Sequence, residues 1–269
     1  MRIGSRDFAT TGHTYIMGIL NVTPDSFSDG GKFNQIDAAL KHAEEMIRDG
    51  ADVIDIGGES TRPGYTKISD EEETDRVVPV IEAVKKEFGI PISVDTYKSG
   101  VAEAAAQAGA DLINDIWGLK YDARMAEVIA KSGLACCLMH NRDNTEYRNF
   151  MEDVKQDLRE TIALAKAAGI EDDKIILDPG VGFAKSYENN LEVIRRLKEF
   201  NELKYPVLLG TSRKSVIGLT LDLPAAERVE GTIVTTVMAV EAGCMFVRVH
   251  DVKENHRAIQ MAEAILDRK

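Results

Sequence analysis

The chain alternates short apolar runs with longer amphipathic segments from one end to the other, and this alternation restricts its possible folds more than any other feature. The apolar runs predict eight strands, at Thr14–Leu20, Val53–Ile56, Ile90–Val94, Leu112–Asn114, Leu134–Met139, Ile175–Leu177, Pro206–Leu209 and Met245–Val249. Helical periodicity follows each run, at Ile36–Arg48, Asp70–Phe88, Ser99–Ala108, Ala123–Lys131, Met151–Ala168, Asn189–Phe200, Ala225–Glu241 and His256–Leu266. A repeated strand–helix unit implies parallel strands, because the helix returns the chain to the same end of the sheet.

Eight such units in 269 residues predict an α/β fold, a single (β/α)8 TIM barrel with long βα loops 1 and 2. A doubly wound open sheet is the alternative, but it usually has fewer strands. Glycine ends predicted helices directly before the next strand, as at Gly50 and Gly109, which supports the division into units. No linker or change in composition divides the chain, so residues 1–269 are predicted to form one barrel domain.

The charge balance excludes several classes of partner. The chain has 33 basic and 45 acidic residues and a net charge of −12, whereas binding to nucleic acid or to an anionic membrane needs a basic face. Cys136, Cys137 and Cys244 lie in apolar runs without the spacing of metal ligands. Residues 1–12 have no apolar leader, and no later run reaches the roughly 18 apolar residues of a membrane span. A cytoplasmic protein without nucleic-acid or membrane partners is expected.

Polar residues end or follow the predicted strands. In a parallel barrel the active site is built at the carboxyl ends of the strands, so these positions form the predicted site. They are Asn21, Asp55, Glu59, Asp95, Asn114, Asp115, His140, Asp178, Lys214, Arg248 and His250. Any strand end tends to be polar, but this many carboxylates, amides and cations at one mouth indicates an active site.

Two connections between a strand and its helix are unusually long. Asn21–Gln35 and Gly57–Ser69 each exceed 12 residues, whereas such turns typically have about 2–6. Both are rich in glycine, hydroxyl and acidic residues, and the first carries a lone Phe27 among them. Loops of this kind are usually lids or binding segments, so both are predicted to contribute to the site.

Seven segments resemble, in order along the chain, the signature segments of the dihydropteroate synthase family. They are Asn21–Gly31, Gly58–Gly64, Ser93–Thr96, Ile113–Asp115, Asp178–Phe183, Gly210–Ser215 and Arg248–Asp251. The chain departs from the family pattern after Leu138–His140, where it continues with Asn141-Arg142-Asp143-Asn144. The role of this fifth loop is left open.

The resemblance implies a transferase of folate biosynthesis that is a target of sulfonamides. Enzymes of this family join para-aminobenzoate to 6-hydroxymethyl-7,8-dihydropterin pyrophosphate, giving 7,8-dihydropteroate and pyrophosphate. An SN1-like course is expected, in which pyrophosphate leaves first and a pterin cation forms. Mg²⁺ is the implied cofactor, and a homodimer formed through the late helices is the implied assembly.

The resemblance also implies a role for each site residue, and the catalytic set is Asp95, Asp178, Lys214, Arg248 and His250. Asp178 is expected to accept two adjacent N–H groups of the pterin, because a carboxylate matches such an edge. The remaining pterin contacts are expected from Asp95, Asn114, Ile116, Met139, Phe183, Lys214 and Arg248. Pyrophosphate is expected to bind Asn21, Arg62, Arg248 and His250, with Asn21 also reaching the metal. Aminobenzoate is expected near Phe27, Arg62, Pro63, Lys214 and Ser215.

Three other functions remain open. A barrel that transfers a methyl group from methyltetrahydrofolate to a corrinoid protein would share the pterin pocket, but would not need the residues of the two long loops. A non-catalytic pterin-binding barrel would be expected to lack the anion-binding residues, yet Asn21, Arg62, Arg248 and His250 are all present. A Schiff-base aldolase would use Lys214, but no other aldolase feature accompanies it.

Overall fold

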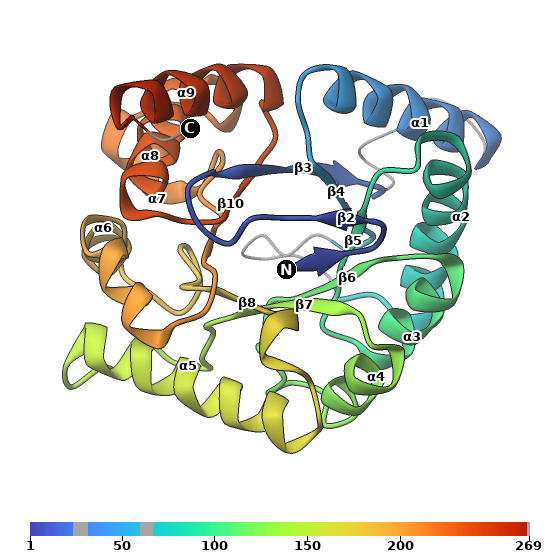
Figure 1. The fold of residues 1–269 in the computed structure, drawn as a ribbon, viewed down its shortest axis with the longest axis horizontal. Helices are drawn as coiled ribbons and strands as arrows, with labels where there is room; N and C mark the ends of the chain where they lie inside the picture. The colour runs from blue at the N-terminus through green and yellow to red at the C-terminus, as the bar shows by residue number, and fades with distance from the viewer. Residues whose placement is uncertain (24–31, 60–66, 268–269) are drawn as a thin grey trace.

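The computed structural model describes residues 1–23, 32–59 and 67–267 of the chain. Eight parallel strands form its central sheet (Figure 1): β3 (Tyr15–Asn21), β4 (Val53–Gly57), β5 (Ile92–Asp95), β6 (Leu112–Asp115), β7 (Ala135–Met139), β8 (Ile175–Asp178), β9 (Leu208–Leu209) and β10 (Phe246–Val249). Their order is β8-β7-β6-β5-β4-β3-β10-β9. A parallel bridge between Leu177 and Val207 joins the two edges and closes the sheet into a barrel. The predicted (β/α)8 fold is confirmed.

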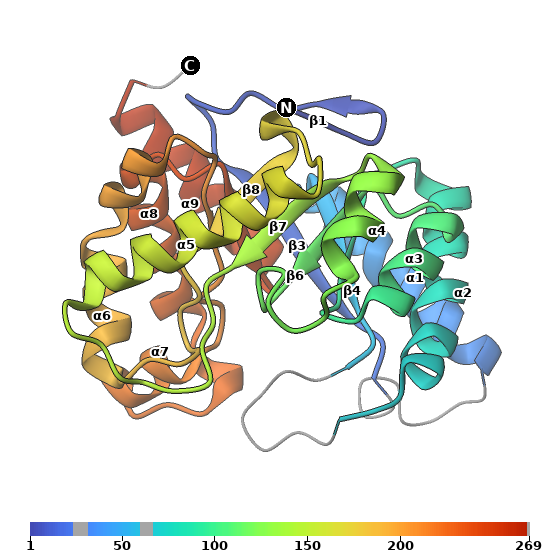
Figure 2. The ribbon, with the colours of Figure 1, turned by 90° about the horizontal axis from the view of Figure 1, so that it is seen from below.

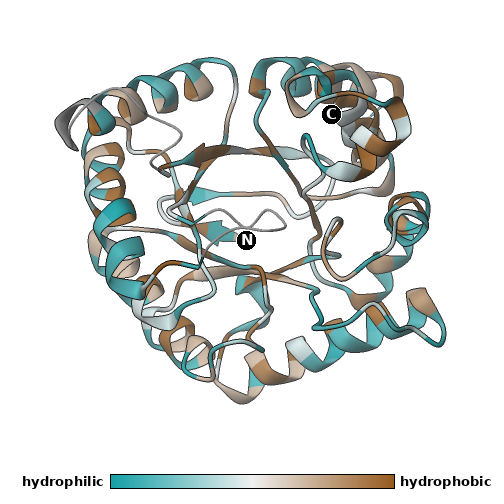
Figure 3. Cartoon of the chain, turned by 180° about the vertical axis from the view of Figure 1, so that it is seen from behind, coloured by the Kyte–Doolittle hydropathy of each residue, from teal (hydrophilic) through white to brown (hydrophobic). Residues whose placement is uncertain are grey.

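Helices surround the barrel: α1 (Lys32–Arg48), α2 (Asp70–Phe88), α3 (Ser99–Ala108), α4 (Met125–Ser132), α5 (Phe150–Ala167), α6 (Tyr187–Arg195), α7 (Ser215–Leu221), α8 (Val229–Ala242) and α9 (Val252–Ile265). Apolar and polar residues alternate along them, as Figure 3 shows. In α2 the apolar face buries Val77, Ile81 and Val84, while Ser69 caps the first turn by accepting from the Glu72 amide at 3.1 Å. Gly89 ends this helix in the left-handed conformation, with φ 59°.

The structure corrects the sequence prediction in the second half of the chain. The single helix expected over Asn189–Phe200 ends at Arg195, and a 3₁₀ helix follows at Leu197–Leu203. The helix expected over Ala225–Glu241 begins only at Val229, because a 3₁₀ turn follows Pro224. Helix α7 was not predicted, since its seven residues are too short to establish a helical period.

A short hairpin closes the amino-terminal end of the barrel, within residues 1–12, where no strand was predicted. It pairs β1 (Arg2–Ile3) with β2 (Arg6–Asp7), and Figure 2 shows it at the end opposite α7. Ile3 and Phe8 are buried against Met17, Leu208 and Phe246 in the barrel interior. Side chains therefore fill this end, and the carboxyl ends of the strands form the mouth.

Two smaller expectations concern cysteines and membranes. Cys136, Cys137 and Cys244 are buried and form no disulfide. Burial raises the pKa of the Cys136 thiol, as expected for a cysteine in an apolar run. None of the described helices has the length and apolar character needed to cross a bilayer.

Candidate active site

An arginine held between two carboxylates forms the centre of the mouth. Arg248, on β10, donates through Nε to Asp55 Oδ2 at 2.6 Å and through Nη2 to Asp95 Oδ2 at 2.7 Å. Ser93 Oγ donates to Asp55 Oδ1 at 2.5 Å, and Asn114 Nδ2 lies 3.3 Å from Asp55 Oδ2. These contacts join β4, β5, β6 and β10 across the barrel. Burial acts to lower the pKa of Arg248, but the charges of Asp55 and Asp95 outweigh this effect and raise the pKa above its usual value. The guanidinium therefore stays charged.

Asp95 has one oxygen that no protein group satisfies. Its Oδ2 accepts from Arg248, whereas Oδ1 is buried without a hydrogen-bond partner and is the one such side-chain atom among the described residues. Burial raises the pKa of Asp95 to about 7, although the neighbouring Arg248 acts to lower it. An unpaired buried acceptor is costly, so this oxygen indicates a ligand that supplies an N–H or O–H donor.

Asp178 ends β8 and lies close to Lys214. Its Oδ1 accepts from the Gly180 amide at 2.7 Å, in the turn that follows the strand. Burial raises the pKa of Asp178, although the positive charge of Lys214 acts to lower it. The second oxygen, Oδ2, faces Gly210, where a Cβ atom would lie 3.5 Å from it and 3.8 Å from Lys214 Nζ. The carboxylate and the ammonium thus border one space beside Gly210.

Lys214 is directed into the barrel by the turn before α7. Arg213 adopts φ 58° there, and its Nε donates to Asp251 Oδ2 at 3.0 Å. Lys214 Nζ donates to the carbonyl of Val181 at 2.5 Å and lies 4.8 Å from the centre of the Phe183 ring. Burial lowers the pKa of Lys214 to about 8. The ammonium is therefore a buried cation over an aromatic face, beside the Asp178 carboxylate.

Replacement of Gly210 by alanine is expected to weaken binding of the pterin that the family resemblance implies, without unfolding the protein. The added methyl group would contact Asp178, Lys214 and Arg248 at 3.5–3.9 Å, which is ordinary packing distance for the protein. It would, however, occupy the space that these side chains border. We expect at least a tenfold rise in KM for the pterin substrate and an unchanged thermal unfolding midpoint. An unchanged KM would mean that the ligand does not use this space.

An apolar wall lies beside these polar groups. Ile116 and Met139, both predicted to contact the pterin, are buried together with Tyr97, and Trp117 and Phe183 pack against them. The three residues predicted to contact the pterin through apolar surface, Ile116, Met139 and Phe183, thus lie in one cluster. Sequence reasoning missed Tyr97 and Trp117, although each lies two positions after an aspartate that ends a strand and Trp117 is the single tryptophan of the chain.

The residues expected to bind the pyrophosphate are placed in different ways. Asn21 ends β3, and its Oδ1 and the Cβ of Asp95 would each lie 3.6 Å from a Cβ on Gly57, so the two side chains are neighbours. His250 Nδ1 and Ser212 Oγ are joined by a hydrogen bond of 2.9 Å. That Asn21, Arg248 and His250 reach one anion stays a prediction.

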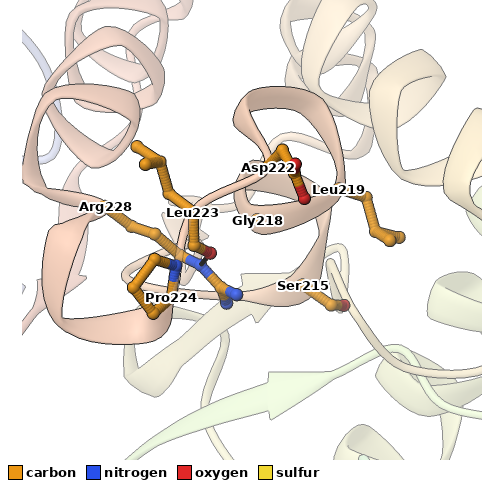
Figure 4. Close-up of a pocket in the computed structure, with 7 residues that line it drawn as sticks. All are labelled: Ser215, Gly218, Leu219, Asp222, Leu223, Pro224 and Arg228. Atoms are coloured by element: carbon orange, nitrogen blue, oxygen red, sulfur yellow. Dashed lines mark hydrogen bonds between the residues drawn. The ribbon is translucent and has the colours of Figure 1, made fainter.

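Three predicted contacts lie outside the described residues. Phe27, Arg62 and Pro63 belong to the two long loops, in stretches that the structure does not describe. Ser215 is described and begins α7, where it lines a cavity of about 350 Å³ (Figure 4). The Arg228 guanidinium lines the same cavity and donates to the carbonyls of Leu223 and Arg213, at 2.9 Å each.

Several polar residues of the predicted mouth have structural partners. Asp115 accepts from the Trp117 and Leu119 amides at 2.9 and 2.7 Å, so its carboxylate caps a turn. Glu59 accepts from Lys98 Nζ at 2.7 Å and from the Ile68 amide at 2.9 Å. These hydrogen bonds give both carboxylates a role in holding loops.

Asp55 is the functional residue that sequence reasoning left without a role. It is fully buried and is the counter-ion of Arg248 at the centre of the site. The sequence does contain a sign of this role, because Asp55 is the one acidic residue within the apolar run Val53–Ile56. A charge in such a strand needs a buried partner of opposite sign, which Arg248 on β10 supplies.

Comparisons with known proteins identify the family. A model of the family described as pterin binding enzyme matches residues 17–250. The dihydropteroate synthase of Clostridium beijerinckii is 62% identical over 269 residues, covering 100% of both chains. That of Bacillus subtilis is 55% identical over 255 residues, covering 95% of this chain and 90% of the relative.

Solved structures agree with these sequence relatives. A dihydropteroate synthase of Clostridium difficile, determined in the presence of pteroic acid, superposes with a TM-score of 0.93 at 52% identity and covers 100% of both chains. The Yersinia pestis enzyme in complex with a sulfonamide drug has a TM-score of 0.93 at 43% identity and covers 99% of both chains. With its fold, its mouth and its relatives in agreement, the chain belongs to the pterin-binding enzyme family and is one of its dihydropteroate synthases.

Proposed function

We propose that the residues of the mouth bind 6-hydroxymethyl-7,8-dihydropterin pyrophosphate and join its methylene carbon to the amine of para-aminobenzoate. The observation that carries this proposal is the unsatisfied, buried Oδ1 of Asp95, whose carboxylate pairs with Arg248 and lies near enough to Lys214 for the two charges to interact. Asp178 lies beside the same Lys214. A dihydropterin has N–H groups on more than one edge and an oxo group, so it suits two carboxylates and an ammonium.

The pterin is held at its edges and on its faces. Its adjacent N–H groups donate to Asp178, another N–H donates to Asp95 Oδ1, and Lys214 donates to the oxo oxygen. The apolar wall supports this arrangement on one face of the ring, through Met139 and Ile116. Arg248 supplies a guanidinium plane for stacking, and its two carboxylate partners fix the orientation of that plane.

The bond to be broken joins the methylene carbon to the pyrophosphate oxygen. Its electron pair leaves with pyrophosphate, and the positive charge that remains spreads into the pterin ring. Asp95 and Asp178 stabilise that cation, because their carboxylates are buried where electrostatic attraction is strong. The aminobenzoate nitrogen then forms the new C–N bond and loses a proton, so no covalent enzyme intermediate is needed.

Aminobenzoate is proposed to bind outside the pterin, with its carboxylate near Lys214 and Ser215 at the start of α7. Both residues are described by the structure, and Ser215 lines the adjoining cavity. The contacts proposed for Phe27, Arg62 and Pro63 fall on the undescribed stretches of the long loops. The described residues that precede these stretches, Thr23 and Glu59, follow β3 and β4.

Mg²⁺ is proposed as the cofactor. Among the described residues no group of three or more His, Cys, Asp or Glu side chains is arranged to hold a metal. The amide oxygen of Asn21 is a hard ligand of the kind Mg²⁺ accepts, and this ion usually keeps waters and binds substrate phosphates. When bound, Mg²⁺ would neutralise charge on the departing oxygens. Arg248 is proposed to add positive charge beside the pyrophosphate, and His250 is proposed to contact it.

The test is an assay of pyrophosphate release. Pyrophosphate should appear only when the pterin substrate and para-aminobenzoate are both present, and EDTA should remove the activity until Mg²⁺ is restored. Methyl transfer from methyltetrahydrofolate to a corrinoid protein, without pyrophosphate release, would instead identify the methyltransferase alternative. Pterin binding with neither reaction would identify a non-catalytic barrel.

The pH dependence of kcat/KM for the pterin substrate should be bell-shaped. Asp95 has a pKa of about 7, raised by burial, so its carboxylate becomes protonated as the pH falls below that value. Lys214 has a pKa of about 8, lowered by burial, so it loses its charge as the pH rises above that value. Activity should therefore peak between about 7 and 8. In Lys214→Arg the alkaline limb should disappear, since a guanidinium remains protonated. An unchanged alkaline limb would assign it to another group.

A homodimer formed through the late helices is proposed. Val234 on α8 and Met261 and Ile265 on α9 are large apolar residues with 60%, 62% and 71% of their surface exposed. Exposed apolar side chains on neighbouring helices fit an interface between two copies. Light scattering should give twice the chain mass of 29.6 kDa. The variant Val234→Asp should shift the mass toward one copy, and a monomeric wild type would contradict the proposal.

A further inference from the structure

A cluster of one buried and four half-buried polar side chains packs against the loop that follows β8, and the mechanism proposed above does not use it. It consists of His140, Arg142, Tyr147, Asp157 and Lys185, which we call the buttress cluster. His140 follows β7, Asp157 lies on α5, and Lys185 precedes α6. Arg142 and Tyr147 lie in or directly after the fifth loop, where the chain departs from the family pattern.

Lys185 is the centre of the cluster. Its half-buried side-chain nitrogen donates to the carbonyls of Gly180 and Phe183 at 3.0 and 3.1 Å, and contacts His140 Nδ1 at 2.8 Å. The ionised Asp157 carboxylate can only accept, so the ring hydrogen of His140 lies on Nε2 and Nδ1 accepts from Lys185. That hydrogen is donated to Asp157 Oδ2 at 2.9 Å. Burial lowers the pKa of His140 to about 4, which agrees with a neutral ring.

The fifth loop contacts the same carboxylate from the other side. Arg142 Nη2 donates to Asp157 Oδ1 at 3.1 Å, and its guanidinium lies 4.5 Å from the centre of the Tyr147 ring. Tyr147 in turn donates its hydroxyl hydrogen to the Ala184 carbonyl at 2.8 Å. Burial acts to raise the pKa of Asp157, but the bonds from His140 and Arg142 hold it below its usual value. Asp157 is therefore an ionised anchor for both Arg142 and His140.

The loop that these groups hold has an unfavourable backbone. Gly180, Gly182 and Ala184 have φ values of 71°, 89° and 46°. A positive φ is strained at Ala184, because alanine, unlike glycine, carries a Cβ atom. A Cβ on Gly180 would lie 2.0 Å from the His140 carbonyl, so the two chain segments are in close contact. Such a conformation persists only where surrounding contacts fix it. The cluster supplies three of them, to the carbonyls of residues 180, 183 and 184.

The same loop presents the pterin-binding groups. The Gly180 amide orients Asp178 through Oδ1, the Val181 carbonyl holds Lys214 Nζ, and the Phe183 ring lies beneath that ammonium. A shift of this loop would move all three groups together. Misplacement of reacting or binding groups by about 1 Å can lower a rate by roughly 10²-fold.

We propose that Lys185, His140 and Tyr147 are positioning residues that fix the loop of residues 180–184 in the geometry that binds the pterin. In this role the fifth loop and the residues after it act as a structural support, through the bond of Arg142 to Asp157 and of Tyr147 to Ala184. The inference rests on the proposed function, because it assigns these residues to the binding of the pterin substrate. Its test therefore includes a binding measurement that does not depend on turnover.

Lys185→Met is the first test, with Lys155→Met as its matched control. Lys155 is also a poorly exposed lysine held by acceptors, but its partners Glu152 and Glu202 lie on α5 and in the 3₁₀ helix, not in the loop of residues 180–184. Lys185→Met should raise KM for the pterin substrate roughly 10- to 100-fold, with less than a twofold change in KM for aminobenzoate. Lys155→Met should leave both KM values unchanged. The Kd of the dihydropterin pyrophosphate, measured by calorimetry without aminobenzoate, should follow the pterin KM.

A second pair of variants covers the outcome in which Lys185→Met fails to fold. His140→Gln keeps one acceptor and one donor, whereas His140→Leu keeps neither, so pterin affinity should be retained in the first and lost in the second. Tyr147→Phe should weaken pterin binding several-fold, while Tyr205→Phe, which loses a hydroxyl bonded to Asp172, should not.

The inference is overturned if His140→Leu and Tyr147→Phe lower the unfolding temperature but leave the pterin Kd at its wild-type value. The cluster would then serve stability alone. Absence of pyrophosphate release by the wild type would refute the proposed reaction, and the calorimetric Kd values of the same variants would still decide the positioning role.

Discussion

Replacement of Asp178 by alanine is expected to abolish pterin binding while the barrel remains folded. The carboxylate is the acceptor proposed for two pterin N–H groups, and a hydrogen bond to a charged group contributes about 1.5–3 kcal/mol. Loss of both should weaken binding roughly 10²- to 10⁴-fold. The cost to the fold is the bond from Gly180 to Oδ1, about 1 kcal/mol. Calorimetry with the dihydropterin pyrophosphate and thermal unfolding measure the two effects separately.

Two further variants make this result specific. Asp178→Asn can still accept from the Gly180 amide, but its NH₂ group would face the N–H groups of the ligand, so affinity should stay low while stability returns. Asp111→Asn removes a charge from another nearly buried carboxylate, one that pairs with Lys85 at 2.7 Å near the start of β6, away from the mouth. It should leave pterin affinity unchanged. Wild-type affinity in Asp178→Ala would remove this residue from the pterin site.

Replacement of Lys214 by alanine is expected to cause the second large effect, a loss of turnover in a folded protein. Its ammonium is the proposed donor to the pterin oxo group and a cation near the aminobenzoate carboxylate. Removing one preorganised donor from an active site typically lowers kcat by about 10²- to 10³-fold. Because burial lowers the pKa of this group to about 8, its desolvation opposes folding, and its removal should cost little stability.

The control for Lys214 is Lys85→Ala, at the opposite end of the barrel. Lys85 is bound to Asp111 through both carboxylate oxygens at 2.7 Å, so its loss should lower stability without changing kcat. Steady-state kinetics should show the reverse pattern for Lys214→Ala, with the unfolding midpoint preserved. Kinetic constants close to the wild type would exclude Lys214 from the site.

The fold was predictable because its signals are local. Helices α2 and α3 have the predicted bounds, since each combines an apolar period with a glycine directly after its last turn. The errors fall where local signals are weak or contradicted by packing. The seven residues of α7 are too few to show a period, and β9 reduces to Leu208–Leu209 because its length is set by pairing with β10. The hairpin of residues 2–7 depends on burial of Ile3 and Phe8, which periodicity does not reveal.

The site was predictable where a residue type matches a chemical task, as for Asp178 or Lys214. Arrangement was harder to foresee. Asp55 pairs with Arg248 across 193 positions of sequence, and such a contact follows only from closure of the barrel. The same holds for Lys185, whose three acceptors come from two different loops. A residue that positions other side chains, and does not itself contact the ligand, has no sequence motif that identifies its role.

The hairpin that closes the amino-terminal end also has a consequence for the order in which ligands bind and are released. Ile3 and Phe8 fill that end, so among the described residues the mouth at the carboxyl ends of the strands is left as the opening for ligands. Asp95 and Arg248 lie inside the opening, whereas Ser215 lies at its rim. A molecule bound at the rim would block the path of a second ligand to the interior. The pterin substrate should therefore enter before aminobenzoate, and the joined product should leave as one piece through the route by which both halves arrived.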